Sequence, residues 1–167
     1  GSPLFSSIRD IAVTFPLSIE PEATNWAANL WENMDLKDKN VVAVAPGSIQ
    51  PHKRWPVEKF IMLCKKLVES YDVKLLIIGT SADKQLGDSI VQNIPTVAIN
   101  ITGQASIQQS AAVLRRCILL VGNDGGAMHL GAAVGCKCVS IVSGIEYPGS
   151  IEPWDNADLA VRHDVSC

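Results

Sequence analysis

Positively charged side chains that could hold a phosphate lie together in residues 46–55, which have the sequence PGSIQPHKRW. Lys53 offers a compact charge, and the guanidinium of Arg54 could pair with two phosphate oxygens at once. Ser48 could donate a hydrogen bond through its hydroxyl or its backbone. The alternative is that Lys53 and Arg54 form a solvated surface pair. This segment is therefore a candidate phosphate-binding loop.

A second candidate is the glycine-rich segment 122–126, with the sequence GNDGG, which precedes a helical pattern. Gly125 and Gly126 would expose backbone N–H groups at the positive end of that helix, where a diphosphate is favoured. Side chains tilt toward the start of a helix, so His129 could donate to the same diphosphate; a buried histidine is the alternative. Asp124 is predicted to cap the helix, because a bare carboxylate would repel a diphosphate.

Other chemistries find less support in the sequence. It has no GxGxxG after its first predicted strand, no Walker lysine motif, no nucleophile elbow and no plausible pair of catalytic carboxylates. The five cysteines are an odd number without disulfide spacing, and Cys136 and Cys138 lack a second pair of metal ligands. We therefore expect buried free thiols, a reducing cytoplasm and no metal site.

Strand and helix patterns alternate from residue 41 onward. Short apolar runs predict strands at 41–45, 73–78, 95–99, 117–121, 137–142 and 158–161. Helical spacing predicts helices from Pro56 past Leu67, over 83–92, after a capping box at Ser106, and over 125–135. In the helix after Ser106 we expect Ile107, Ala111 and Leu114 on the inner face.

This alternation predicts right-handed βαβ units, and the continuous apolar runs predict strands covered on both faces. The expected fold class is α/β: a doubly wound, Rossmann-like parallel sheet with strand order 3-2-1-4-5-6. A ligand binds such a sheet at the carboxyl edge where the strand order reverses, between the first and fourth strands. Residues 46–55 and 122–126 follow those two strands, so we expect them to form one site.

The first forty residues do not fit this repeat. Residues 11–15 could form a strand, and apolar residues at helical spacing predict a helix from about Glu22. We expect residues 1–40 to be a linker strand and docking helix, and residues 41–167 to be the Rossmann-like domain.

Charge and hydropathy limit the expected partners and location. The net charge of -3 argues against a nucleic-acid partner, which requires a large basic excess. The longest apolar runs have the length of strands, whereas a membrane span needs roughly 20 apolar residues. No signal-peptide pattern opens the chain. We therefore expect a cytoplasmic protein without a membrane span.

The order and spacing of several segments resemble the C-terminal domain of the heptosyltransferases of lipopolysaccharide core synthesis, glycosyltransferase family 9. The matching pieces are PGS at 46–48, KRWP at 53–56, Gly79 with Asp83, NDGGAMH at 123–129 and SGIEYPG at 143–149. The resemblance runs from about residue 10 to the end of the sequence.

The resemblance implies one half of a two-Rossmann-domain (GT-B) glycosyltransferase that inverts the anomeric centre without a metal ion or other cofactor. The donor, an ADP-sugar such as ADP-heptose, would bind to this half. The acceptor would be a lipopolysaccharide-type, lipid-linked glycan or another glycan. The acceptor and the catalytic base would belong to an N-terminal domain that is absent. We therefore expect this chain alone to be inactive, in the cytoplasm or peripheral to the inner membrane.

The resemblance also implies roles for individual residues. The diphosphate would be held by Lys53, Gly125, Gly126 and His129, and the predicted donor site also includes Ser48, Arg54 and Asp124. Asp83 would hold the ribose hydroxyls, with Gln104 and Ala105 near the base. Family members usually have Thr where this chain has Gly125, so one hydroxyl donor is lost. Glu146 is the carboxylate that stays open as an alternative base.

Two other functions stay open at this point. A sugar-nucleotide epimerase half would share the architecture, but it needs an acid/base pair that the sequence does not offer. A non-catalytic nucleotide-sugar-binding or sensing module would fit the missing threonine. Binding data separate these classes, because a sensor need not prefer a sugar nucleotide over free ADP.

Overall fold

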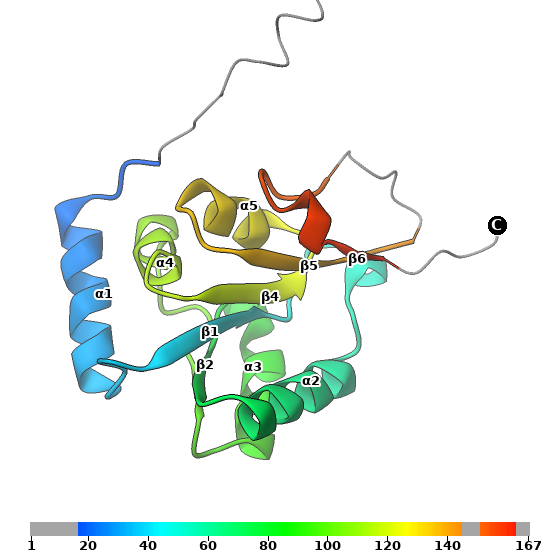
Figure 1. Cartoon of the computed structure of the whole chain (residues 1–167), viewed down its shortest axis with the longest axis horizontal. Coiled ribbons are helices and arrows are strands. Elements are labelled where there is room, and N and C mark those ends of the chain that lie inside the picture. The colour runs from blue at the N-terminus through cyan, green and yellow to red at the C-terminus, as the bar shows by residue number, and fades with distance from the viewer. Residues whose placement is uncertain (1–16, 145–150, 163–167) are drawn as a thin grey trace, which may run out of the picture.

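The computed structural model describes residues 17–144 and 151–162. At its centre is a six-stranded parallel sheet of order β3-β2-β1-β4-β5-β6 (Figure 1). Its strands are β1 (Asn40–Ala45), β2 (Val73–Ile77), β3 (Ala98–Asn100), β4 (Leu119–Asn123), β5 (Cys138–Val142) and β6 (Val161–Arg162). The structure thus confirms the predicted α/β fold class and strand order, with the reversal between β1 and β4.

Helices cover both faces of the sheet, as the uninterrupted apolar strands predict. One face carries α1 (Pro21–Asn33), α4 (Ile107–Leu114) and α5 (Gly126–Ala133), and the other carries α2 (Val57–Ser70) and α3 (Lys84–Asn93) (Figure 1). Neighbouring residues of one strand enter opposite layers: Leu76 packs with the first group and Leu75 with the second. No helix within the described ranges is long and apolar enough to cross a membrane.

The predicted helix near Glu22 is present as α1 and belongs to the core. Ala27 and Trp31 of α1 are buried, and the Arg116 guanidinium lies 5.5 Å from the centre of the Trp31 ring. This cation–π contact connects α1 to the end of α4. The strand predicted at 11–15 lies outside the described residues, and the division at residue 40 stays a prediction.

The strand starts that differ most from the prediction are those of β3, β4 and β6. β3 begins at Ala98 rather than at residue 95, because the N–H groups of Val97 and Ala98 both bond to the Ile94 carbonyl in a turn. β4 begins at Leu119, because the N–H of Cys117 closes a turn onto Leu114. Residues 157–159 form a 3-10 turn, and β6 follows it.

The helix α4 begins as predicted, and it buries two of the three residues expected on its inner face, Ala111 and Leu114. The Ser106 hydroxyl accepts a hydrogen bond from the Gln109 N–H at 3.2 Å, and the Gln109 side chain accepts one from the Ser106 N–H at 2.8 Å. This capping box satisfies two backbone donors that the helix leaves open. Ile107, however, is 76% exposed, so its predicted place on the inner face is wrong. Residues 111–114 form the buried part of α4.

Candidate functional site

A cavity of about 1170 Å³ opens where β1 and β4 part, at the carboxyl edge of the sheet. Its walls come from the segments that follow β1, β2, β3 and β4 and from residues along the length of α4 and α5. The predicted residues that line it are Ser48, Lys53, Arg54, Asp83, Ala105, Asp124, Gly125, Gly126 and His129. The two segments expected to form one site therefore do meet in the structure.

Lys53 and Asp124 form an ion pair in this cavity. The Lys53 Nζ lies 2.9 Å from the Asp124 Oδ2, and the two side chains are 14% and 7% exposed. The prediction that Asp124 caps α5 is wrong: Gly125 occupies the N-cap position, and no described side chain caps the helix. The nearly buried carboxylate of Asp124 needs a cation close to it, and this need outweighs capping the start of α5. Lys53, which is 71 residues away in the chain, supplies the cation.

The start of α5 presents backbone donors to the same cavity. Within the described part of the chain, the N–H groups of Gly126 and Ala127 have no hydrogen-bond partner. A Cβ added at Gly125 or Gly126 would meet nothing closer than 4.0 Å, so packing does not require glycine at either position. The two glycines leave open space beside the start of α5, which would allow an anion to approach its N–H groups.

His129 lies one turn into α5 and also lines the cavity. The residue is exposed, so the alternative of a buried histidine is wrong. An exposed imidazole at this end of α5 can donate to the same anion as the N–H groups of Gly126 and Ala127.

The loop after β1 is held by Asn123, a residue that the sequence analysis did not single out. The residue is 2% exposed; its Oδ1 accepts from the Trp55 N–H at 2.9 Å, and its Nδ2 donates to the Pro46 carbonyl at 2.7 Å. One amide therefore joins both ends of the loop that carries Lys53. The signal for it was a polar residue at the buried end of an apolar strand.

Arg54 contributes to the shape of that loop. Its Nε donates to the Ser48 carbonyl at 2.7 Å, which draws the loop together. Arg54 is exposed, whereas the side chain of Lys53 is mostly buried, so the two residues do not form the solvated pair considered as an alternative.

Asp83 closes the cavity wall between β1 and β2. Its Oδ2 accepts from both the N–H and the hydroxyl of Thr80, each at 2.8 Å. The carboxylate also lies against the backbone of Gly47, where any Cβ would collide with it. Asp83 is 8% exposed and holds the loops after β1 and β2 together.

The two residues predicted near the base differ in their placement. Ala105 lines the cavity, whereas the Gln104 side chain is exposed and donates from Nε2 to the Asn100 carbonyl at 3.1 Å. The side chain of Gln104 thus stabilises the loop rather than the cavity surface. Glu146 lies outside the described residues.

The cysteines behave as core residues. Cys64, Cys117, Cys136 and Cys138 are free and buried, which confirms the expected thiols at these positions. Burial raises the pKa of the Cys64 thiol to about 12. Among the residues that the structure describes, no group of three His, Cys, Asp or Glu side chains could hold a metal ion.

A doubly wound sheet with a cavity at its strand reversal is the architecture in which nucleotide-binding domains hold their ligands. Residues 11–167 match the model of glycosyltransferase family 9 (heptosyltransferase), and the chain belongs to that family. This confirms the resemblance seen in the sequence.

Several named proteins are similar to this chain. Lipooligosaccharide heptosyltransferase 2 of Haemophilus influenzae is 28% identical over 141 residues, which are 79% of this chain and 40% of that protein. Lipopolysaccharide heptosyltransferase 2 of Escherichia coli K12 is 28% identical over 131 residues, 75% of this chain and 37% of that protein. The crystal structure of the glycosyl transferase family 9 from Veillonella parvula superposes with a TM-score of 0.81 at 25% identity, covering 91% of this chain and 43% of that one. The chain thus spans about 40% of the length of the first of these curated relatives.

The expectation that this family works without a metal is wrong. The dodecameric heptosyltransferase TibC of enterotoxigenic E. coli is iron-containing, and its fold is similar to this chain with a TM-score of 0.57 at 20% identity, over 78% of this chain and 33% of that one. The described residues do not gather three ligands for such an ion.

Proposed function

We propose that this chain is the donor-binding half of an inverting glycosyltransferase, which transfers a sugar, heptose, from an ADP-sugar to a lipopolysaccharide-type glycan acceptor. One observation carries the proposal: the N–H groups of Gly126 and Ala127, which no acceptor in the described ranges satisfies, share a cavity with the Lys53–Asp124 ion pair. Backbone donors, a helix dipole and a lysine form a site for the diphosphate of a sugar nucleotide.

In this proposal the diphosphate lies between the start of α5 and Lys53. The N–H groups of Gly126 and Ala127 and the imidazole of His129 donate to its oxygens. Asp124 holds the Lys53 ammonium in place, so that its positive charge lies beside the phosphates. Negative charge grows on the departing diphosphate as its bond to the anomeric carbon breaks. Donors already fixed in place stabilise that charge most.

The nucleoside is proposed to extend from the diphosphate toward Asp83 and Ala105, along the walls formed after β2 and β3. The cavity, at about 1170 Å³, is large enough for a nucleotide and a sugar. ADP is the proposed carrier because TibC, a protein of similar fold, has been solved with ADP-D-beta-D-heptose. The ribose role of Asp83 and the base-side role of Ala105 belong to this proposal.

Inversion follows from a single displacement, in which an acceptor oxygen attacks as ADP leaves. The alternative, a double displacement, needs a carboxylate nucleophile beside the anomeric carbon. The two described carboxylates in the cavity are engaged: Asp124 by Lys53 and Asp83 by Thr80. We therefore assign the acceptor and its base to the part of the relatives that this chain does not match, with residues 1–40 as the crossing between the halves. The proposed location is the cytoplasm, peripheral to the inner membrane; the free buried thiols support the reducing compartment.

A titration of the chain with ADP, followed by NMR of its backbone amides, tests the proposal. We expect the largest shifts at Gly125, Gly126, Ala127 and Ala105, with smaller shifts for UDP. Shifts outside the cavity, or none at saturating ADP, would refute the donor site.

A further inference from the structure

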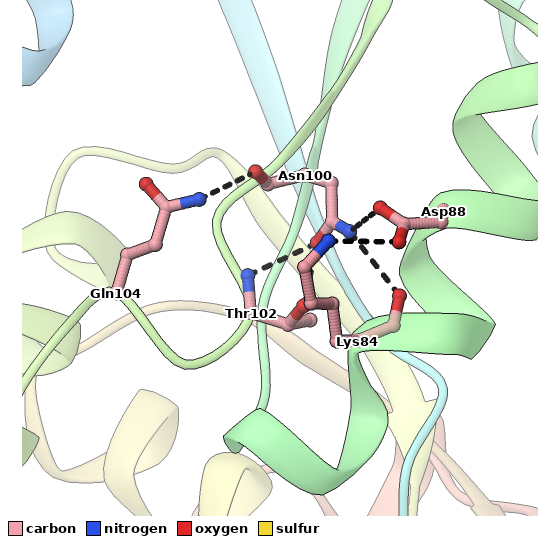
Figure 2. Close-up of polar contacts among 5 residues, drawn as sticks. All are labelled: Lys84, Asp88, Asn100, Thr102 and Gln104. Atoms are coloured by element: carbon pink, nitrogen blue, oxygen red, sulfur yellow. Dashed lines mark hydrogen bonds and ion pairs between the residues drawn. The ribbon is translucent and has the colours of Figure 1, made fainter.

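Outside the cavity, a group of hydrogen-bonded polar side chains surrounds Asn100, the last residue of β3. Figure 2 shows this group: Asn100 lies between α3, which carries Lys84 and Asp88, and the loop that carries Thr102 and Gln104. None of these four partners lines the cavity, so their contacts need an explanation of their own.

On the loop side, Asn100 holds the chain through three hydrogen bonds. Its Oδ1 accepts from the N–H of Thr102 at 3.0 Å and from the Thr102 hydroxyl at 2.8 Å (Figure 2). Its backbone carbonyl accepts from the Gln104 side chain at 3.1 Å. The Thr102 residue is 4% exposed, so these contacts fix the start of the loop inside the protein.

On the helix side, the same amide is anchored to α3. Its Nδ2 donates to the Asp88 Oδ1 at 2.7 Å and to the Lys84 carbonyl at 3.4 Å, and the Lys84 ammonium holds the other Asp88 oxygen at 2.8 Å (Figure 2). Gly87 makes room for the contact, because a Cβ there would lie 2.5 Å from the Asn100 Oδ1. Both ends of the Asn100 amide are therefore satisfied.

The loop fixed by Asn100 forms part of the cavity wall. The Gly103 N–H donates to the Gly79 carbonyl at 2.9 Å. Gly103 has a φ of +73°, and a Cβ added there would lie 2.8 Å from the Ser81 Cα. The loops after β2 and β3 thus touch backbone to backbone. Gly103 and Ala105 line the cavity, and no acceptor within the described part of the chain satisfies the Ala105 N–H.

We propose that Asn100 is a positioning residue for base selection: it holds residues 101–105 so that the Ala105 N–H meets the edge of the nucleobase. The proposal rests on the proposed function, since it takes the cavity to be the ADP site. A donor held at a fixed place discriminates between bases whose edges differ there. Adenine offers an acceptor at N1, whereas hypoxanthine carries a hydrogen at that atom.

Affinities for ADP, inosine diphosphate (IDP) and pyrophosphate, measured by calorimetry, test this role. For the wild-type chain we expect ADP to bind at least about tenfold more tightly than IDP, as one directed hydrogen bond allows. Asn100→Asp puts a carboxylate against Asp88, which should move the loop and lower the ADP-to-IDP ratio about fivefold or more. Pyrophosphate affinity should not change, because the diphosphate contacts lie after β1 and β4.

A double variant provides the rescue. Asn100→Asp combined with Asp88→Asn exchanges donor and acceptor across the same contact, so the ratio should return toward the wild-type value. Asp88→Asn alone should keep the ratio, since its amide oxygen still accepts from Asn100. Asn93→Asp, on the exposed end of α3, is the matched control. If Asn100→Asp does not fold, Thr102→Val removes the hydroxyl contact alone and should lower the ratio less.

The outcomes separate the two claims. The role of Asn100 is overturned, and the donor site is not, if the wild-type chain binds ADP with no preference over IDP. The same holds if Asn100→Asp and Thr102→Val lower the melting temperature but leave the ADP-to-IDP affinity ratio unchanged. A wild-type chain that binds neither ADP nor pyrophosphate overturns the proposed function, and the inference with it. A ratio that falls in Asn100→Asp and recovers in the double variant supports the inference.

Discussion

Single residues decide whether the cavity can hold a diphosphate, and Lys53 carries its positive charge. Lys53→Ala should weaken ADP binding by about 1–3 kcal/mol, the range for a lost charge-assisted hydrogen bond. Adenosine binding should change much less, because adenosine has no phosphate. Calorimetry with both ligands measures the difference, and equal losses for both would contradict a phosphate role for Lys53.

The ion pair requires a control in that experiment. Removing Lys53 leaves Asp124, whose side chain is 7% exposed, without its partner, which can destabilise the fold by about 3 kcal/mol. The double variant Lys53→Ala with Asp124→Asn removes both charges and should recover most of the stability without recovering ADP affinity. Recovery of affinity as well would show that Lys53→Ala acts only through the fold.

The sequence predicts which residues gather in the cavity better than it predicts what they contact. Loop position after a parallel strand is enough to place Lys53, Gly126 and His129 at one edge of the sheet. The partner of Asp124 lies 71 residues away, and local capping rules could not reveal that ion pair. Gly126 was informative because neither backbone conformation nor packing requires a glycine there. Its position at the start of a helix after a strand is what indicated a site.

Among the elements, the loop between β1 and α2 depends on the end of β4 for its shape. Asn123→Ala would leave the Trp55 N–H and the Pro46 carbonyl without their partner, which should lower the free energy of unfolding by at least about 1–3 kcal/mol. Added ADP should raise the melting temperature less than in the wild type, because the loop that carries Lys53 is loosened. Thermal melts with and without ADP measure both effects.

A surface asparagine offers the comparison for that variant. Asn93→Ala removes one exposed contact to the Ser89 carbonyl and should change stability by no more than about 0.5 kcal/mol. If Asn123→Ala were as mild, the hydrogen bonds from Asn123 to Trp55 and Pro46 would not contribute measurably to stability.

Elements were predicted well in type and order, and less well at their boundaries. Continuous apolar runs and helical spacing are local signals, so the β1–β6 alternation and its strand order follow from them. Where β3 and β4 begin depends on turns that end the preceding helices, at Ile94 and Leu114. The exposure of Ile107 depends on the cavity beside α4, which no periodicity encodes.

At the scale of the whole molecule, the chain should hold a donor but not transfer its sugar. The described carboxylates in the cavity are already engaged, and general-base catalysis contributes about 10²–10⁴-fold. We expect transfer to a glycan acceptor to be at least about 100-fold faster when the chain is joined to an N-terminal Rossmann-like half. Product formation is measured by chromatography, and the anomeric configuration by NMR. Comparable transfer by the chain alone, or retention of configuration, would contradict this division of labour.

Binding of the donor to this chain tests the central claim most directly. Calorimetry should show saturable binding of ADP and ADP-heptose at one site, with a dissociation constant of about 1 mM or lower, which corresponds to about -4 kcal/mol. The affinity should fall in Lys53→Ala, and UDP should bind more weakly. A folded chain that gives no saturable heat with either adenine nucleotide, or that binds all of them equally well without Lys53, would contradict the account.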